Sequence, residues 1–304
     1  MKDIYKLFKW RKIIARREKT WEYFTWEYLK GPWGPVETKV VYDNEKIIGQ
    51  YSAQRFQAYY FGEKIMGSLA FDAGTHPDYR RQGIFVALGK LLFSEEGKNN
   101  ILFSNGFPNE SAVPGHKKVK WHFLCPLPLY ECSNIKGIHK NNKYDFENIT
   151  EFDDDFKGFS ERFQDEIPIY LNRTKMYLNW RYVDKPYDYT INKIYDKSGE
   201  MVSYIVTKKY QKTLHLVDFL IPENEDLYND ILYTLECLRM FLMLNKISLY
   251  VNHSHPFCKF LRKHGFKFKD TGRVYIVRKN NDYLDSRLFD EKNHYITMGD
   301  SDVF

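Results

Sequence analysis

The segment His76–Phe85 concentrates residues that suit the binding of a phosphate-bearing anion. It follows Met66–Asp72, a run that predicts a strand, and it precedes an apolar-periodic stretch that predicts a helix. Arg80 and Arg81 supply positive charge, and Gly83 allows the backbone to approach a ligand closely. A helix that begins at such a loop presents unpaired N–H groups and the positive end of its dipole. A diphosphate is the natural occupant of this loop.

The hexapeptide Arg80-Arg81-Gln82-Gly83-Ile84-Phe85 resembles the [R/Q]-x-x-G-x-[G/A] acetyl-CoA motif of the GCN5-related N-acetyltransferase (GNAT) superfamily. It matches at Arg80 and Gly83 and departs at Phe85, where Gly or Ala is usual. Two consequences are possible: the backbone at Phe85 lies farther from the phosphates, or the Phe85 side chain points into the core. The flanking segments Thr75–Tyr79, Gly106–Ser111 and Pro114–Trp121 resemble a bacterial GNAT subgroup. The resemblance covers roughly residues 20–130.

The resemblance implies an N-acetyltransferase that moves an acetyl group from the co-substrate acetyl-CoA to a small-molecule amine in a ternary complex. A neutral amine attacks the thioester directly, and an acid protonates the leaving thiolate. Pantetheine pairs in this family with the backbone of the fourth strand, which corresponds to Phe71–Thr75 here. The co-substrate-binding residues implied in this way are Ala73, Gly74, Thr75, Arg80, Arg81, Gln82, Gly83, Ile84, Phe85 and Asn109.

His116 and Glu110 are the catalytic candidates that the resemblance implies. The family's acid is often a Tyr four residues before a closing Gly-aromatic pair, and the same count from Lys120-Trp121 leads to His116. Glu110, with Asp72 as the other carboxylate near the inferred site, is the candidate base. Other roles stay open, because His116 can instead cap a helix or face solvent. Glu110 can be a solvated loop residue, and Asp72 can order the end of its strand.

An internal repeat divides the chain into two halves. Trp26-Glu27-Tyr28-Leu29-Lys30-Gly31-Pro32 and Trp180-Arg181-Tyr182-Val183-Asp184-Lys185-Pro186 share a W-[E/R]-Y-x-x-x-P pattern. After each copy, the patterns predict the same order β-β-β-α-β-α-β, with final strands near His122–Glu131 and Arg273–Arg278. We therefore predict a tandem duplication, with residues 1–140 as a GNAT domain that carries the acyl-CoA-binding loop and residues 141–304 as a degenerate GNAT-like domain.

The predicted fold class is α/β (α+β), with two tandem GNAT-like domains that each hold a mixed, mostly antiparallel sheet flanked by helices. The second half lacks an R-x-x-G loop and offers the acidic stretch Glu223–Asp230 in its place. Acidic residues there would repel a diphosphate. One competent CoA site is therefore expected. Aromatic residues such as Trp26 and Tyr28 are expected to pack in the core rather than to line an acceptor pocket. The same pattern recurs at residues 180–182, in the half without a CoA motif.

Charge and composition exclude several classes of protein. The 46 Lys and Arg residues exceed the 40 Asp and Glu residues by only 6, which argues against a nucleic-acid partner. The basic stretch Met1–Lys19 predicts an amphipathic helix, with a membrane-surface helix as the alternative. No apolar run approaches the length of a membrane span, and no signal peptide is recognised, so a cytoplasmic location is expected. The four cysteines lack CxxC spacing, so no metal site is predicted.

Three functions remain open at this point. The leading one is N-acylation of a small amine, such as an amino sugar or another metabolite. The second is a non-catalytic acyl-CoA-binding or interaction module, which the departure at Phe85 favours. The third is a Fem-like aminoacyl transferase, which Arg80–Gly83 argues against because those proteins lack a working R-x-x-G loop. The acceptor, the acyl length and the oligomeric state are not determined by these patterns.

Overall fold

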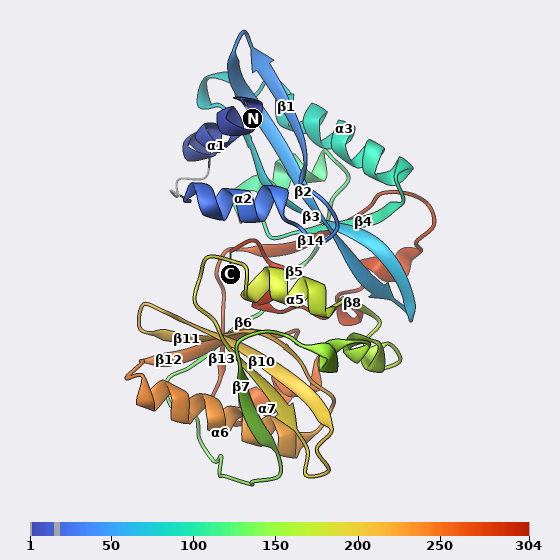
Figure 1. The fold of residues 1–304 in the computed structure, drawn as a ribbon. Coiled ribbons are helices and arrows are strands. Elements are labelled where there is room, and N and C mark those ends of the chain that lie inside the picture. The colour runs from blue at the N-terminus through green and yellow to red at the C-terminus, as the bar shows by residue number, and fades with distance from the viewer. Residues whose placement is uncertain (1, 15–18, 304) are drawn as a thin grey trace. The chain divides into compact units, whose positions relative to one another are not determined.

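The computed structural model describes residues 2–14 and 19–303 (Figure 1). The chain forms two compact units. Unit 1 contains residues 1–125, 184–186 and 272–290, and unit 2 contains residues 126–183, 187–271 and 291–304. Arg16 and Arg17 of the N-terminal basic stretch lie outside the described residues.

The sheet of unit 1 has the strand order β1-β2-β3-β4-β14-β5. Its β3 and β4 run parallel, whereas β1 with β2, β2 with β3, and β14 with β4 pair antiparallel. These strands are β1 (Glu37–Asp43), β2 (Lys46–Tyr60), β3 (Glu63–Thr75), β4 (Ile101–Gly106), β5 (His122–Pro126) and β14 (Val274–Lys279).

Helices lie on both sides of this sheet, as Figure 1 shows, with α1 (Lys2–Ile14) and α2 (Trp21–Leu29) on one side and α3 (Ile84–Lys98) on the other. The glycines at 49 and 89 explain how closely α3 approaches β2. A Cβ on Gly49 would lie 2.5 Å from Cγ2 of Ile84, and a Cβ on Gly89 would lie 3.0 Å from the Tyr51 ring. The short helix α4 (Val113–Lys117) follows β4.

The sheet of unit 2 has the strand order β13-β6-β12-β11-β10-β9-β7, and its β11 and β12 run parallel. The helix α6 packs on β11 and β12 and against α7, while α5 carries the second Trp-x-Tyr copy. The elements are β6 (Leu129–Cys132), β7 (Asp145–Ile149), β8 (Ile169–Leu171), α5 (Lys175–Tyr182), β9 (Thr190–Tyr195), β10 (Met201–Tyr210), β11 (Thr213–Leu220), α6 (Glu225–Phe241), β12 (Lys246–Tyr250), α7 (Pro256–Lys263) and β13 (Lys267–Lys269). Both units thus have mixed, mostly antiparallel sheets flanked by helices, as expected.

The final strands of the two halves are exchanged between the sheets. The expected single strand near His122–Glu131 is split into β5 and β6 by Pro126 and Pro128, which cannot donate to a strand ladder. β6 joins β12 in unit 2, and β14 joins β4 in unit 1. The expectation that Arg273–Arg278 closes the second half is therefore wrong. The two-domain division at residue 140 stays a proposal, and the chain passes into unit 2 at Pro126.

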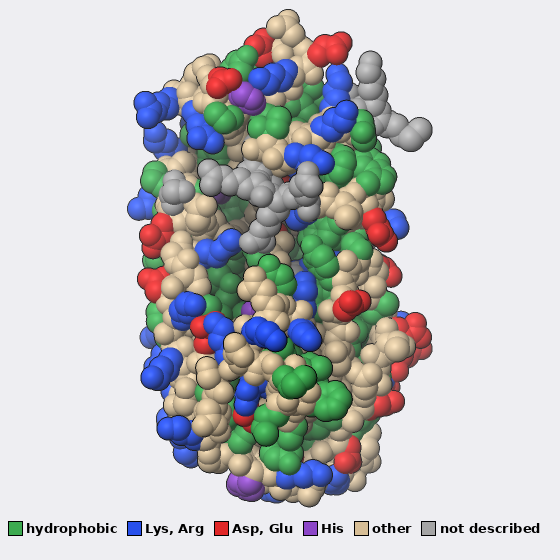
Figure 2. Space-filling view, turned by 90° about the vertical axis from the view of Figure 1, so that its left-hand side faces the viewer, with side chains coloured by type: hydrophobic (Ala, Val, Ile, Leu, Met, Phe, Trp, Pro, Cys, Tyr) green, Lys and Arg blue, Asp and Glu red, His purple; other side chains and the backbone are tan. Residues whose placement is uncertain are grey.

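The N-terminal helix α1 is held by an apolar cluster. Ile4, Leu7 and Phe8 pack against buried aromatic residues that include Phe24, whereas Ile13 is half exposed. Lys and Arg side chains are spread over the face in Figure 2 rather than gathered in one block, in keeping with the net charge of +6. Within the described part of the chain, no helix is long and apolar enough to cross a membrane.

Candidate acyl-CoA site

The strands β3 and β4 diverge at the point where a co-substrate is expected. Their parallel ladder ends at the pair Ala70 and Gly106, although β3 continues to Thr75. That extension stays paired with β2, through Gly49 and Thr75. The chain after β4 instead turns toward β14, because the Val274 N–H donates to the Pro108 carbonyl at 3.1 Å. One backbone edge of residues 71–75 therefore faces away from β2 without continuing the β4 ladder.

Residues 73–75, which the family resemblance assigns to pantetheine, lie on this extension. Ala73, Gly74 and Thr75 are each partly exposed. The preceding residue, Asp72, has φ +45°, a left-handed conformation that is uncommon for a residue other than Gly and that accompanies the register shift opposite β2. The local kink aims the extension away from β4.

The loop that follows β3 leads directly into the N-terminus of α3. Gly83 occupies the N-cap position with φ +81°, and no described side chain caps the helix there. Arg81 also has a positive φ of +65°, and Arg80, Arg81 and Gln82 are exposed. Since the first N–H groups of a helix lack intrahelical partners, this terminus can donate to an anion while the two guanidinium groups lie nearby. The geometry suits a diphosphate.

The side chain of Phe85 points inward, which accounts for the departure from the motif. Its ring centroid lies 5.0 Å from that of Tyr51 and 5.2 Å from that of His116. A Cβ added to Gly115 would lie 3.1 Å from the Phe85 ring, so the glycine makes room for it. Phe85 therefore belongs to the core beneath the loop, and its side chain does not displace the backbone N–H groups at the helix start.

His116 is buried in the same cluster, with 7% of its surface exposed. Its Nδ1 lies 2.9 Å from the Tyr51 hydroxyl, and its ring meets Trp121 edge-on at 5.6 Å. Burial lowers the pKa of His116 to about 4, because the apolar surroundings penalise the imidazolium. The imidazole is therefore neutral at neutral pH, which does not favour the general-acid role inferred from the sequence.

Glu110 and Asn109 lie in the loop after β4. Asn109 caps the short 3-10 helix η2 (Glu110–Ala112), because its side-chain oxygen accepts from the Ala112 N–H at 3.1 Å. Glu110 is exposed, and its N–H donates to the Gly272 carbonyl. The assignment of Asn109 to pantetheine and of Glu110 to base catalysis stays a prediction, since the Asn109 oxygen already serves the local turn.

A buried polar network lies beside β3, and the sequence patterns did not predict it. Arg11 of α1 forms ion pairs with Glu27, at 2.9 Å, and with Asp72. The Tyr28 hydroxyl donates to Asp72 at 2.9 Å and accepts from Gln50 at 2.7 Å. Asp72 is thus held by a cation and a hydroxyl. The signal was present in the repeated Trp-x-Tyr pattern, whose Tyr28 was assigned to packing alone.

The corresponding helix start in unit 2 is closed by the chain itself. Asn224 caps α6 through the Leu227 N–H at 3.0 Å, and Glu225 and Asp226 occupy the first turn. The Asn141 and Lys143 N–H groups donate to Asp230, one turn farther on. Acidic side chains and an internal cap make this terminus unsuited to a diphosphate, as expected from the sequence.

The divergence between β11 and β12 is filled by the C-terminal segment of the chain. Their ladder ends at Leu216 and Leu249. The Tyr295 hydroxyl donates to the Phe219 carbonyl at 3.0 Å, and the Ile296 N–H donates to Asn252 at 3.0 Å. Residues 295 and 296 therefore bond both the end of β11 and the chain after β12.

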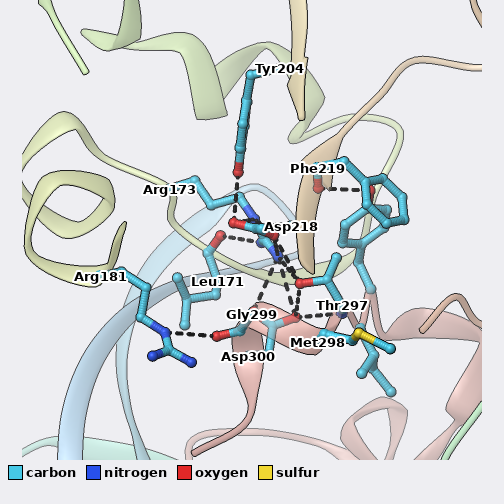
Figure 3. A network of polar contacts seen from close by, with 12 residues as sticks. Leu171, Arg173, Arg181, Tyr204, Asp218, Phe219, Thr297, Met298, Gly299 and Asp300 are labelled. Atoms are coloured by element: carbon cyan, nitrogen blue, oxygen red, sulfur yellow. Dashed lines mark hydrogen bonds and ion pairs between the residues drawn. The ribbon is translucent and has the colours of Figure 1, made fainter. Parts of the chain in front are cut away.

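A buried ion network holds this segment in place (Figure 3). Nη2 of Arg173 lies 2.9 Å from Asp218 of β11 and 3.1 Å from Asp300 of the C-terminal segment. The Thr297 hydroxyl donates to Asp218 at 2.8 Å, and the Tyr204 hydroxyl donates to the other oxygen of Asp218 at 2.9 Å. Every member is almost fully buried, so the segment is an integral part of unit 2.

The sequence matches a known family over the part that holds this site. Residues 15–123 match the family described as Acetyltransferase (GNAT) domain. This stretch of the chain is therefore similar to GNAT domains. The matched stretch contains the loop at Arg80–Gly83 and the diverging strands β3 and β4. Among curated proteins, none matches the chain in sequence.

Solved structures extend the likeness to both units. A conserved Enterococcus faecalis protein, described as a probable N-acyltransferase, superposes with a TM-score of 0.71 at 12% identity, over 91% of this chain and 70% of that one. An Anabaena variabilis GCN5-related N-acetyltransferase has a TM-score of 0.65 at 15% identity, over 80% of this chain and 63% of that one. The chain therefore spans less than two thirds of the Anabaena protein.

A third similar structure is matched over nearly its whole length. It is a tandem GNAT protein from the clavulanic acid biosynthesis pathway, with a TM-score of 0.61 at 11% identity, and it is matched over 92% of this chain and 96% of that one. At such identities the likeness shows the fold alone. The chain has the tandem GNAT fold, and within residues 2–14 and 19–303 no group of three or more His, Cys, Asp or Glu side chains is arranged to hold a metal ion.

Proposed function

We propose that the protein is an acetyl-CoA-dependent N-acyltransferase that acts on a small-molecule amine through a single co-substrate site in its first GNAT domain. The observation that carries the proposal is the extension of β3 beyond its last pair with β4, Ala70 and Gly106, next to the uncapped start of α3. A strand edge along which β4 no longer pairs can hydrogen-bond the amides of pantetheine, and the helix start can bind the diphosphate. Both features lie within residues 71–85.

The proposed binding mode assigns separate tasks to the two parts of the site. The backbone of residues 71–75 pairs with pantetheine, and the N–H groups of Gly83, Ile84 and Phe85 bind the diphosphate. Arg80 and Arg81 add charge attraction from the solvent side. The thioester is then held beside the point where β3 and β4 separate, so an amine bound there attacks at high effective concentration.

Proton transfer in this proposal does not depend on an imidazolium at residue 116. Because His116 is neutral at neutral pH, its supported role is to hold the Tyr51 hydroxyl and the Phe85 ring in place. Glu110 is the candidate base, as an exposed carboxylate in the loop after β4. The network of Arg11, Asp72 and Tyr28 orders the β3 extension from the other side.

Acetyl-CoA titration of the wild type and of Gly83→Glu tests the co-substrate site. The new carboxylate would lie at the diphosphate position on a backbone of φ +81°, so we expect loss of measurable acetyl-CoA binding. Gly199→Glu is the matched control, since Gly199 has φ +86° in the turn between β9 and β10. Retained acetyl-CoA affinity in Gly83→Glu would refute the site.

Thiol release from acetyl-CoA across a panel of small amines and amino sugars tests the reaction. We expect CoA release that depends on the amine and is lost in Gly83→Glu. The runner-up function is an acyl-CoA-binding module without turnover, which Phe85 favoured from the sequence. Stoichiometric acetyl-CoA binding without CoA release on any amine would support that alternative and count against the enzyme.

A further inference from the structure

The C-terminal end of α6 exposes an unusual concentration of large apolar side chains. Met240 is 64% exposed, Phe241 81% and Met243 81%. Tyr210, at the tip of the β10–β11 hairpin, is 58% exposed. The two segments are neighbours, because the Asn245 N–H donates to the Lys212 carbonyl at 2.8 Å and Thr213 pairs with Lys246. We call these four side chains the α6 apolar tip.

Two backbone hydrogen bonds define the chain's path at the C-terminal end of α6. The Leu244 N–H donates to the Arg239 carbonyl at 2.9 Å, and the Met243 N–H donates to the Met240 carbonyl at 3.0 Å. This pair of bonds is the Schellman motif, in which Gly usually takes the left-handed position. Here that position is Met243, with φ +52°. A strained backbone that presents a large apolar side chain to solvent indicates a functional use of that side chain.

The charges around the tip are positive. The hairpin contributes Lys209 and Lys212, which are exposed and have no ion pair among the described residues. The stretches 208–213 and 239–246 together hold five Lys or Arg residues and no Asp or Glu. Two of these cations, Arg239 and Lys246, pair with the nearby Glu236 and Glu131. Lys208 lies over the Tyr187 ring, 3.9 Å from its centroid, so Lys209 and Lys212 are the cations left to face an external anion.

We propose that the α6 apolar tip and Lys209 and Lys212 dock the protein onto an anionic lipid bilayer. Exposed Met, Phe and Tyr side chains enter the boundary between head groups and acyl chains, while the ammonium groups contact lipid phosphates. This pairing of apolar and cationic groups matches a bilayer surface, which offers both at once. The docking is peripheral and independent of the acyl-CoA site, which lies in the other unit.

Sedimentation of the full chain with vesicles tests the docking. We expect binding to phosphatidylcholine–phosphatidylglycerol vesicles that weakens as salt rises, and little binding to phosphatidylcholine alone. Lys209→Gln and Lys212→Gln should each weaken binding about fivefold. Phe241→Ser should weaken it further, whereas Met176→Ser is the control, because Met176 on α5 is 54% exposed but lies in another element.

Met243→Gly separates docking from folding. Glycine suits φ +52°, so this variant should unfold at a temperature no lower than the wild type and yet bind anionic vesicles less well. Equal vesicle binding by the wild type and by Met243→Gly and Phe241→Ser would overturn the proposal. So would a wild-type dimer, measured by light scattering, that Met243→Gly converts to a monomer, since a second copy would then be the occupant.

Discussion

Ala70 and Gly106 form the last pair of the parallel ladder between β3 and β4, and Asp72 follows two residues beyond Ala70 on the strand that continues. In unit 2, Asp218 follows two residues beyond Leu216, the last residue of β11 that pairs with β12. Each aspartate is bound by a buried arginine and by a tyrosine hydroxyl. The duplication therefore extends to a carboxylate at the same place in each fold.

The two copies differ in what lies next to that carboxylate. In unit 2 the partner Arg173 also binds Asp300, so the C-terminal segment occupies the divergence of the strands. In unit 1 the partner Arg11 binds Glu27 of α2 instead. In unit 2 the C-terminal segment of the chain therefore lies between the diverging strands. In unit 1 the end of β3 instead lies next to the N-terminus of α3, which no described side chain caps.

Replacing both loop arginines should weaken acetyl-CoA binding without unfolding the protein. Arg80→Gln combined with Arg81→Gln removes two exposed guanidinium groups, and each charge-assisted contact to phosphate is worth roughly 1.5–3 kcal/mol. We expect at least about a tenfold rise in the acetyl-CoA Kd and a shallower dependence of Kd on salt. Lys197→Gln in unit 2 is the control. An unchanged Kd would exclude a phosphate role for these residues.

His116→Gln should affect stability more than the pH dependence of the rate. The folded pKa of about 4 lies below the usual 6.5, so the unfolded chain binds the proton more tightly and the wild type loses stability as pH falls from about 6.5 to about 4. Urea unfolding should show this loss diminished in His116→Gln. If the alkaline limb of the kcat/KM profile disappears instead, His116 is the general acid after all.

Glu96 should destabilise the protein as the pH rises. Its carboxylate is buried, and Oε2 accepts from Ser68 at 2.8 Å and from Ser104 at 3.1 Å. Burial raises the pKa of Glu96 to about 7, above its usual 4.5, so the folded state keeps a proton that the unfolded chain releases between these values. Stability therefore falls by about 3 kcal/mol across that window.

The Glu96→Gln variant checks this sign. Its free energy of unfolding in urea should change less between about pH 5 and about pH 8 than that of the wild type, and it should exceed the wild-type value at the higher pH. A variant less stable than the wild type at both pH values would mean that the carboxyl is retained for its hydrogen bonds alone.

Arg173→Met should cost roughly 3–5 kcal/mol of stability, because it leaves the buried carboxylates Asp218 and Asp300 without a cation. Thermal unfolding measures the change. Lys197→Met is the matched control, since its ion pair with Asp145 is exposed and contributes about 0–1 kcal/mol. A similar loss in both variants would contradict a structural role for the network. Acetyl-CoA should still bind the folded Arg173→Met protein at one site.

The sequence alone predicted features that depend on neighbours along the chain. The strand-loop-helix around Gly83, the order of elements before the final strand of each half and the acidic start of α6 all follow from local periodicity and turn residues, and each is present. The repeat of Trp26 and Tyr28 at residues 180 and 182 also predicted the two-domain fold. These patterns can be recognised in the sequence itself, so predicting the elements from them does not require knowing how the side chains pack.

Only the tertiary structure decided the features that arise between distant segments. In the tertiary structure β14 pairs with β4 and the Phe85 side chain points inward. His116 is buried, and this burial lowers the pKa of its imidazole to about 4. The tertiary structure also brings Arg11 to Asp72 and the C-terminal residues to β11. Burial and charge at a residue depend on every segment that packs around it, and no local pattern encodes which distant strand or side chain that will be.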